Sequence, residues 1–150
     1  MRVYKEAIAA FSIGPLMFIQ GILVRRRAVE LPEAKGPRAG IVGKGKPLRL
    51  LVIGDSSAAG VGVNAQDEAI AGQLAVQLAD RFQVAWKLLA KTGATTKSHT
   101  QSLIEQVEGK FDAAMICLGV NDVTHGVNLR AWLKQQTTLY DVLENRFGVQ

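Results

Sequence analysis

The chain has 150 residues, of which 48% are hydrophobic and 21% charged, a balance typical of one soluble domain with an apolar core. Its net charge of +5 is uneven, because residues 1–50 carry ten Lys and Arg against three Asp and Glu, whereas residues 51–150 carry eight against ten. The slightly acidic second part argues against a nucleic-acid partner. A single cysteine, Cys117, excludes a disulfide framework, and with only two histidines the sequence predicts no metal site.

The first expected element is an apolar helix near the amino terminus. Residues 7–24 carry no charge and are followed by three arginines at 25–27 rather than by small residues, which disfavours a cleaved signal peptide. The stretch approaches the minimum length of a membrane span, although polar residues, glycines and a proline interrupt it. We expect residues 1–27 to form a helix that either anchors the chain to a membrane or packs on the domain, in a membrane-associated or cytoplasmic protein.

The rest of the chain alternates strand and helix patterns. Residues 28–47 hold three of the four prolines and four glycines, which predicts a linker. Three nearly continuous apolar runs then predict strands that are buried on both faces, at 48–54, 82–90 and 112–119. Helical patterns are found at 67–80, 98–108 and 127 to about 145. This order predicts an α/β fold in which helices cover both faces of a parallel sheet, a three-layer αβα arrangement.

Polar residues and glycines follow each expected strand. Ser56 comes two residues after the first strand, Gly93 follows the second in "KTGATT", and Asn121 follows the third in "LGVND". Such sheets bind ligands at the carboxyl ends of their strands, so we expect these residues to converge. Ser56 is our candidate nucleophile for acyl transfer, with three oxyanion donors: its own N–H, the N–H of Gly93 and the Asn121 amide. Asp55 and Asp122 are expected to support the loops by hydrogen bonding.

These blocks resemble those of the SGNH hydrolases, also called the GDSL esterase/lipase family. The stretch "GDSSAAG" at 54–60 resembles the first block, with Ser57 where the family name has leucine. Gly93 resembles the second block's glycine, and "GVND" at 119–122 resembles the third block. The resemblance implies a flavodoxin-like sheet, hydrolysis of esters or thioesters, a small-molecule ester or lipid substrate, and no cofactor.

The family's fourth block, D-x-x-H, supplies the general base and is expected near the carboxyl terminus. The D-x-x-H of this sequence spans 122–125 and overlaps the third block, so His125 is poorly placed to be the base. His99, near the start of a polar helix, is expected to face solvent. We therefore expect residues 48–150 to be a partial SGNH hydrolase domain with about three strands and an unpaired sheet edge.

Two other functions stay open. A catalytically silent fragment or binding module would keep the crevice without a base, and Asp and Ser at the end of a strand also suit a simple helix cap. A nucleotide-binding βαβ domain is suggested by "GVGVNA" at 60–65, which fits G-x-G-x-x-A. Its context disfavours that function, because Gly60 lies six residues past Gly54 and the second strand ends in Ala90-Lys91 instead of an acidic residue.

Overall fold

A computed structural model describes residues 29–149 and nine positions before them. Those positions are Gly14, Leu16, Met17, Ile19, Gln20, Gly21, Leu23, Val24 and Arg27, and all nine are helical. Most of the predicted apolar helix lies outside the described residues. Within the part of the chain that the structure describes, no helix has both the length and the hydropathy to cross a membrane. The chain divides into two compact units, residues 1–31 and 32–150, and the second holds the sheet.

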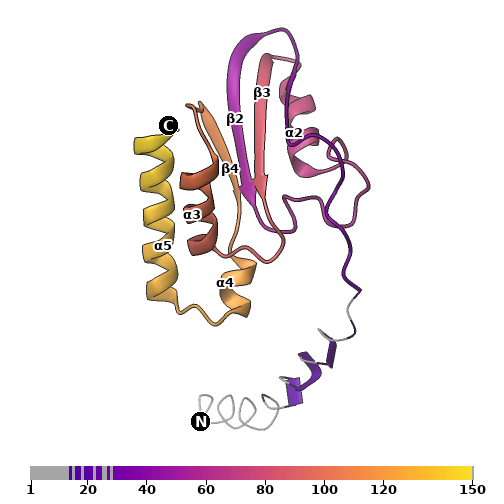
Figure 1. The fold of residues 1–150 in the computed structure, drawn as a ribbon, viewed down its shortest axis with the longest axis vertical. Helices are drawn as coiled ribbons and strands as arrows, with labels where there is room; N and C mark the ends of the chain where they lie inside the picture. Colours follow the sequence, from indigo (N-terminus) through magenta and orange to yellow (C-terminus); the bar gives the residue numbers. More distant parts are fainter. Residues whose placement is uncertain are drawn as a thin grey trace, which may run out of the picture. The chain divides into compact units, whose positions relative to one another are not determined.

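The second unit is built on one four-stranded sheet with the strand order β1-β3-β2-β4 (Figure 1). The strands are β1 (Ala39–Val42), β2 (Lys46–Gly54), β3 (Phe82–Ala90) and β4 (Ala113–Cys117). β2 pairs in parallel with both β3 and β4, whereas β1 pairs antiparallel with β3. The three parallel strands have the order of the first half of a flavodoxin-like sheet, as predicted. In the register, Gly54 lies opposite both Ala90 and Cys117, so these strands end level.

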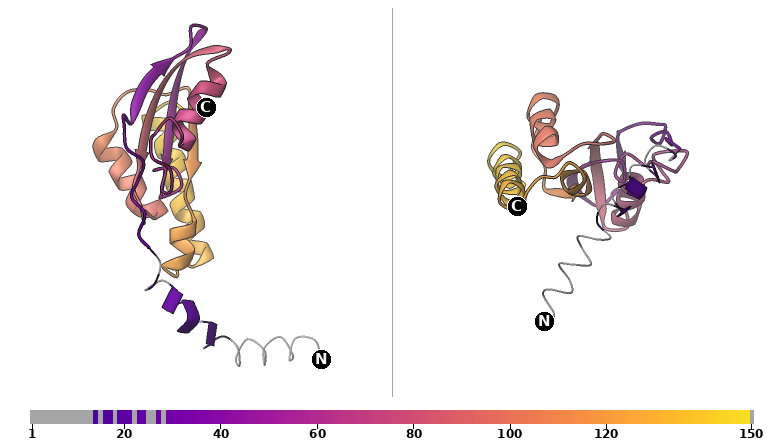
Figure 2. Two further views of the ribbon diagram at one scale, coloured as in Figure 1. Left: turned by 90° about the vertical axis from the view of Figure 1, so that its right-hand side faces the viewer. Right: turned by 90° about the horizontal axis from the view of Figure 1, so that it is seen from below.

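Helices cover both faces of this sheet, which confirms the predicted αβα layers (Figures 1 and 2). They are α2 (Ile70–Leu78), α3 (Thr96–Gln106), α4 (Val120–Thr124) and α5 (Leu129–Asp141), with α5 continued by the π-helical turn η1 (Val142–Arg146). α2 lies on one face, and α3 and α5 lie on the other. The short helix α4 follows the carboxyl end of β4.

The alternation of side chains along β2 supplies both halves of the core. Leu50 and Val52 pack toward α2 against its small residues, in a cluster with Val84 of β3. Leu51 and Ile53 point to the other face and pack against α3 and α5, where the fully buried side chains include Leu103, Leu139 and Phe147. A strand buried on both faces reads as a continuous apolar run, which is why the sequence predicts β2 well.

β1 lies inside residues 28–47, a stretch whose composition predicts a linker without strands. Its hydrogen bonding continues outside the strand, because the Leu88 N–H donates to the Arg38 carbonyl at 2.7 Å. Gly40 faces Trp86 so closely that a Cβ there would come within 2.9 Å of the indole nitrogen, so a glycine is needed for this packing. The strand has four residues that alternate between exposed and half-buried, a pattern too short to stand out among prolines and glycines.

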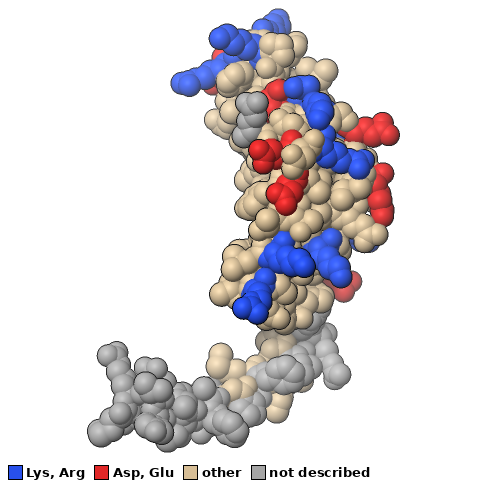
Figure 3. All heavy atoms as spheres, turned by 90° about the vertical axis from the view of Figure 1, so that its left-hand side faces the viewer, with Lys and Arg blue, Asp and Glu red and all other residues tan. Residues whose placement is uncertain are grey.

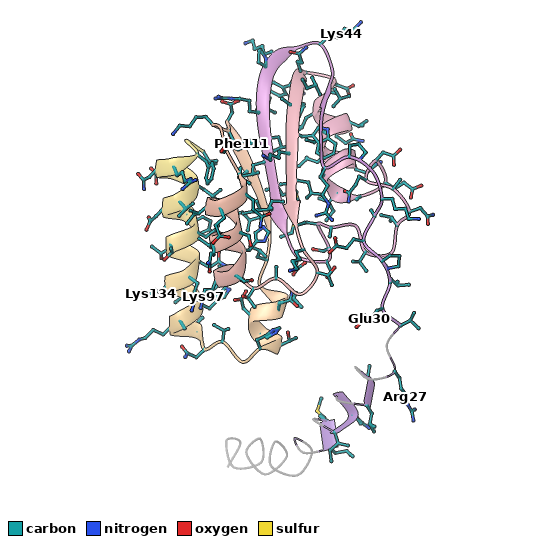
Figure 4. The ribbon with its side chains drawn as sticks, in the orientation of Figure 1. Arg27, Glu30, Lys44, Lys97, Phe111 and Lys134 are labelled. Atoms are coloured by element: carbon teal, nitrogen blue, oxygen red, sulfur yellow. The ribbon has the colours of Figure 1, made fainter. Side chains whose placement is uncertain are left out.

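β4 differs from β2 in how well it is covered. All five residues of β4 are half-buried, whereas Leu50–Gly54 in β2 are buried. Among the described residues, β4 pairs on one side only, which matches the unpaired edge expected from the sequence. Phe111, labelled in Figure 4, lies just before its amino end, and the centroids of the Phe111 and Phe147 rings are 6.3 Å apart.

The surface charge of the second unit is mixed. On the face drawn in Figure 3, basic and acidic side chains are interspersed rather than gathered into a single basic area. Lys97 of α3 and Lys134 of α5, which Figure 4 labels, are both exposed.

Candidate active site

Ser56 is placed by an abrupt turn at the end of β2. A Cβ on Gly54 would come within 2.5 Å of the Ala58 Cβ, so the turn is tight enough to need glycine. The Asp55 N–H donates to the Cys117 carbonyl at 3.0 Å, which continues the sheet by one bond. The Ala59 N–H then donates to the Asp55 carbonyl at 2.9 Å, so the chain enters a helical turn directly after the strand. Ser56 is therefore held, half-buried, at the carboxyl end of the central parallel strand.

The Asp55 carboxylate lies beneath this turn and is only 4% exposed. Its Oδ1 accepts from the Ser57 N–H at 3.0 Å and from the Ser57 hydroxyl at 2.9 Å. Its Oδ2 accepts from the Asn121 amide at 3.2 Å. A buried carboxylate with three donors fixes the backbone on both sides of Ser56, which is the contact pattern that a supporting role requires.

Gly93 belongs to a tight turn after β3. The Ala94 N–H donates to the Lys91 carbonyl at 3.1 Å, and Gly93 at the third position has a φ of +82°. A positive φ at this position is favourable for glycine and costly for other residues. The turn is joined to the central strand because the Lys91 N–H donates to the Gly54 carbonyl at 3.2 Å.

Asn121 connects the loops after all three parallel strands. It lies on α4, and its Nδ2 donates both to the Asp55 carboxylate at 3.2 Å and to the Ala94 carbonyl at 3.0 Å. One amide group therefore binds both Asp55, which precedes Ser56, and Ala94, which follows Gly93. This convergence of three loops is the arrangement that the sequence predicts.

Asp122 anchors α4 to the start of α3. It is 1% exposed, and its carboxylate accepts from the Thr96 N–H at 3.1 Å and from the Thr96 hydroxyl at 2.8 Å. The same hydroxyl accepts from Gln136 Nε2 on α5 at 3.0 Å. Because an amide of the first helical turn has no partner within its own helix, the carboxylate both caps α3 and fixes the residue next to Asn121.

Two candidate oxyanion donors are unoccupied. Within residues 29–149, neither the Ser56 N–H nor the Gly93 N–H donates a hydrogen bond, and the Ser56 hydroxyl has no partner. Both hydrogens of the Asn121 amide are engaged, so a substrate oxygen would have to compete with Asp55 or Ala94 for that third predicted donor.

Among the described residues, neither histidine side chain forms a hydrogen bond with Ser56. His125 is exposed, and its Nδ1 lies 2.7 Å from the Asn121 carbonyl. Because a carbonyl only accepts, Nδ1 carries the proton and leaves a lone pair on Nε2. That tautomer suits a general base, but the ring is hydrogen-bonded to the backbone of α4, the helix that it follows.

His99 corrects an expectation from the sequence. It is 2% exposed instead of facing solvent, and its Nε2 is buried without a partner. Burial lowers its pKa, although a hydrogen bond to the Leu89 backbone and the charge of Asp55 oppose this shift. Its apolar neighbours on α3 were too few for the helix pattern to reveal a buried face. Cys117 is bonded through its carbonyl to the Asp55 N–H, and burial together with the charge of Asp55 raises the pKa of the Cys117 thiol.

Two cavities lie beside the loops that follow β3 and β4. The cavity on the β3 side has a volume of about 420 Å³ and a mostly polar lining that includes Glu33, Arg38 and Gly93. The groove on the β4 side has a volume of about 550 Å³ and is mostly apolar. Its lining residues are Leu118, Gly119, Val120, Asp122, Val123, Val127, Leu129 and Trp132. Neither lining includes Ser56, which follows β2, the strand between β3 and β4.

The geometry does not support the nucleotide-binding alternative. The glycines of "GVGVNA" lie in turns, and α2 starts only at Ile70, so no helix N-terminus directly follows them. The described residues also contain no group of three or more His, Cys, Asp or Glu side chains that could hold a metal ion.

Comparison with known proteins identifies the family. Residues 52–148 match the family described as the GDSL-like Lipase/Acylhydrolase family, and the chain belongs to this family. The match includes Ser56, Gly93 and Asn121. No sequence among curated proteins matches the chain.

Solved structures share the fold over part of their length. TesA has a TM-score of 0.59 and 22% identity, covering 68% of this chain and 57% of its own. AlinE4, an SGNH-hydrolase family esterase, has a TM-score of 0.58 and 19% identity, covering 71% and 59%. The psychrotrophic esterase EstA from Pseudoalteromonas sp. has a TM-score of 0.56 and 22% identity, covering 67% and 55%. The chain thus spans less than two thirds of these proteins.

Proposed function

We propose that this chain is a serine hydrolase of small-molecule carboxylic esters and supplies the nucleophile and the oxyanion donors. The observation that carries the proposal is the position of Asn121, whose amide joins the loops that hold Ser56 and Gly93. Family membership supports the same chemistry. Because the solved relatives are longer, the proposal covers the nucleophile and the oxyanion donors and assigns no general base.

The proposed reaction forms an acyl-enzyme. Ser56 Oγ attacks the carbonyl carbon of the ester, and the carbonyl π electrons move to oxygen, giving a tetrahedral oxyanion. The free N–H groups of Ser56 and Gly93 donate to that oxygen, and Asn121 can join them by releasing its longer bond, to Asp55. When the intermediate collapses, the bond to the alcohol oxygen breaks and the alcohol leaves with the proton lost by Ser56 Oγ. Water then attacks the acyl carbon, the bond to Ser56 Oγ breaks, and the carboxylic acid leaves as Oγ regains a proton from that water.

We assign the two parts of an ester to the two cavities beside the loops after β3 and β4. The groove beside Asn121 exposes apolar side chains, so we assign to it the acyl part of the substrate. The polar cavity beside Gly93 would then take the alcohol part. This orientation favours esters with an apolar acid and a polar alcohol.

The test is p-nitrophenyl acetate hydrolysis by the wild-type chain, by Ser56→Ala and by Thr137→Ala. Thr137 is a matched control, since its exposed hydroxyl donates to the Leu133 carbonyl on its own helix. We expect turnover above the buffer rate in the wild type and in Thr137→Ala, and none in Ser56→Ala. Circular dichroism checks that all three fold. Equal rates for wild type and Ser56→Ala would contradict the proposal.

A second function, a binding module without catalysis, is favoured by one observation. Within residues 29–149, the Ser56 hydroxyl has no hydrogen bond to a histidine or a carboxylate. A fluorophosphonate probe separates the two, because phosphonylation needs an activated serine. Labelling at Ser56 supports the hydrolase, and a folded chain that stays unlabelled supports the binding module.

A further inference from the structure

A short segment ahead of the family match reaches the proposed oxyanion site. This segment, residues 33–38, is called the strap below, and it precedes the matched region, 52–148. Glu33 Oε1 accepts from the Thr92 N–H at 2.7 Å and from the Thr92 hydroxyl at 2.8 Å. Thr92 directly precedes Gly93. A carboxylate from outside the matched region therefore binds the turn that presents the Gly93 N–H.

Arg38 completes this contact from the other end of the strap. Its Nη2 donates to Glu33 Oε2 at 2.5 Å, and its Nη1 donates to the carbonyl of Ala90, the last residue of β3, at 2.6 Å. Hydrogen bonds to charged groups are shorter and stronger than those between neutral groups. Arg38 thus holds the residue before the turn, and Glu33 holds the second residue of the turn.

The strap is itself fixed on the side of β2. The Ala34 N–H donates to the Ala59 carbonyl at 3.1 Å, and Ala34 is only 6% exposed. The buried amide of Gln66 donates to the carbonyls of both Ala34 and Ala59 at 3.1 Å. Ala59 belongs to the helical turn that follows Ser56. The same strap thus contacts the turn after Ser56 and the turn of Gly93.

The turn geometry explains why this matters for catalysis. In a four-residue turn, the central peptide can face either way, and the two orientations are the type I and type II turns. That peptide joins Thr92 to Gly93 and carries the Gly93 N–H. Its direction therefore decides whether this donor points toward a substrate oxygen. Glu33 holds the peptide that precedes Thr92 and the Thr92 side chain, and so fixes the Cα about which the Thr92–Gly93 peptide turns.

The charges are also consistent with such a role. A lone carboxylate near the site would oppose a developing oxyanion, but Arg38 balances it. Burial opposes ionisation of Glu33, yet the hydrogen bonds from Thr92 and Arg38 outweigh it and hold the pKa of Glu33 below its ordinary value. Glu33 is therefore ionised at neutral pH and remains an acceptor for Thr92.

We propose that Glu33 is a positioning residue that orients the Gly93 N–H for oxyanion binding, with Arg38 holding its carboxylate. This inference rests on the proposed function. It adds a group from the strap to a site otherwise made of the family's sequence blocks.

The test compares Glu33→Ala, Glu33→Gln and the exposed control Glu108→Ala in full-length chain. Glutamine keeps an oxygen that can accept from Thr92, so it should restore most of what alanine loses. We expect kcat for p-nitrophenyl acetate to fall roughly 10- to 100-fold in Glu33→Ala with KM unchanged, since one oxyanion donor is worth about 100-fold or more. Glu108→Ala should match the wild type. A kcat within twofold of wild type in folded Glu33→Ala would overturn the proposal.

A second readout does not depend on turnover. In ¹⁵N-labelled chain, the amide resonance of Gly93 should move in Glu33→Ala and stay near its wild-type position in Glu33→Gln. If the wild type shows no Ser56-dependent hydrolysis, the proposed function fails, and this resonance alone decides the orienting role. An unmoved Gly93 resonance would then overturn it. Should Glu33→Ala fail to fold, Thr92→Val removes one of the two bonds, and a smaller change of the same kind is expected.

Discussion

The two flanks of β2 are held in different ways. On the β3 side, β1 adds a further strand and the strap ties the Gly93 turn to charged side chains. On the β4 side, the strand has no second neighbour within residues 29–149, and Val120 and Val123 beside it are 71% and 77% exposed. Charged side chains and an added strand therefore consolidate the β3 flank, whereas the β4 flank depends on a few polar contacts.

The largest expected effect compares one core residue from each flank. Leu88 of β3 is 4% exposed, whereas Ile116 of β4 is half-buried. Leu88→Ala should reduce the free energy of unfolding by about 3 kcal/mol, and Ile116→Ala by about 1 kcal/mol, because a buried cavity costs more than a partly solvated one. Urea unfolding measures both, with equal m-values as the control. Equal losses would show that the two flanks are equally consolidated.

Asp122 offers a sharper test of the β4 side. Asp122→Ala leaves the Thr96 N–H and hydroxyl without their acceptor in a buried place, so we expect a loss of about 2 kcal/mol in unfolding free energy. Asp122→Asn keeps one acceptor and should lose less. Thermal unfolding gives the order of the variants, and faster exchange of the Thr96 amide would locate the change. If Asp122→Ala were as stable as the wild type, Asp122 would not be an anchor of the β4 side.

The smallest effect concerns an ion pair between β2 and the residue before β4. Arg49 and Asp112 form an exposed pair at 2.6 Å, and hydrogen bonds from Arg49 lower the pKa of Asp112 from 3.8 to about 2. Because the folded pKa lies below the unfolded one, the stabilisation is complete above pH 3.8 and disappears as the pH falls toward 2. Solvent screens the pair, so the effect should be small. Arg49→Gln should flatten the pH dependence of Tm in this range, and an unchanged slope would count against it.

The strands and the meeting of the three loops could be predicted because they depend on local patterns. β2 is an apolar run buried on both faces, and the polar residues after each strand must share an edge in a parallel sheet. β1 could not be predicted, because four residues of alternating exposure among glycines give little signal. The bonds that Asn121 makes to Asp55 and Ala94 required the folded loops.

Long-range polar contacts were equally hidden in the sequence. Glu33 and Thr92 are 59 residues apart, and Arg38 and Ala90 are 52 apart. Nothing in a proline- and glycine-rich stretch marks these side chains as partners of a distant turn. His99 was hidden for a different reason, since its helix is polar overall and the buried face includes Thr96 and Thr100.

The strap also bears on what should be treated as the transferable unit of this protein. A graft or gene fusion that took only the family-matched region, 52–148, would carry Ser56, Gly93 and Asn121 but leave Glu33 and Arg38 behind. It would also cut β2 in its middle and discard β1. The region that matches the family and the region that is joined by hydrogen bonds therefore start at different residues. The hydrogen-bonded region starts at the strap, about twenty residues before the family match.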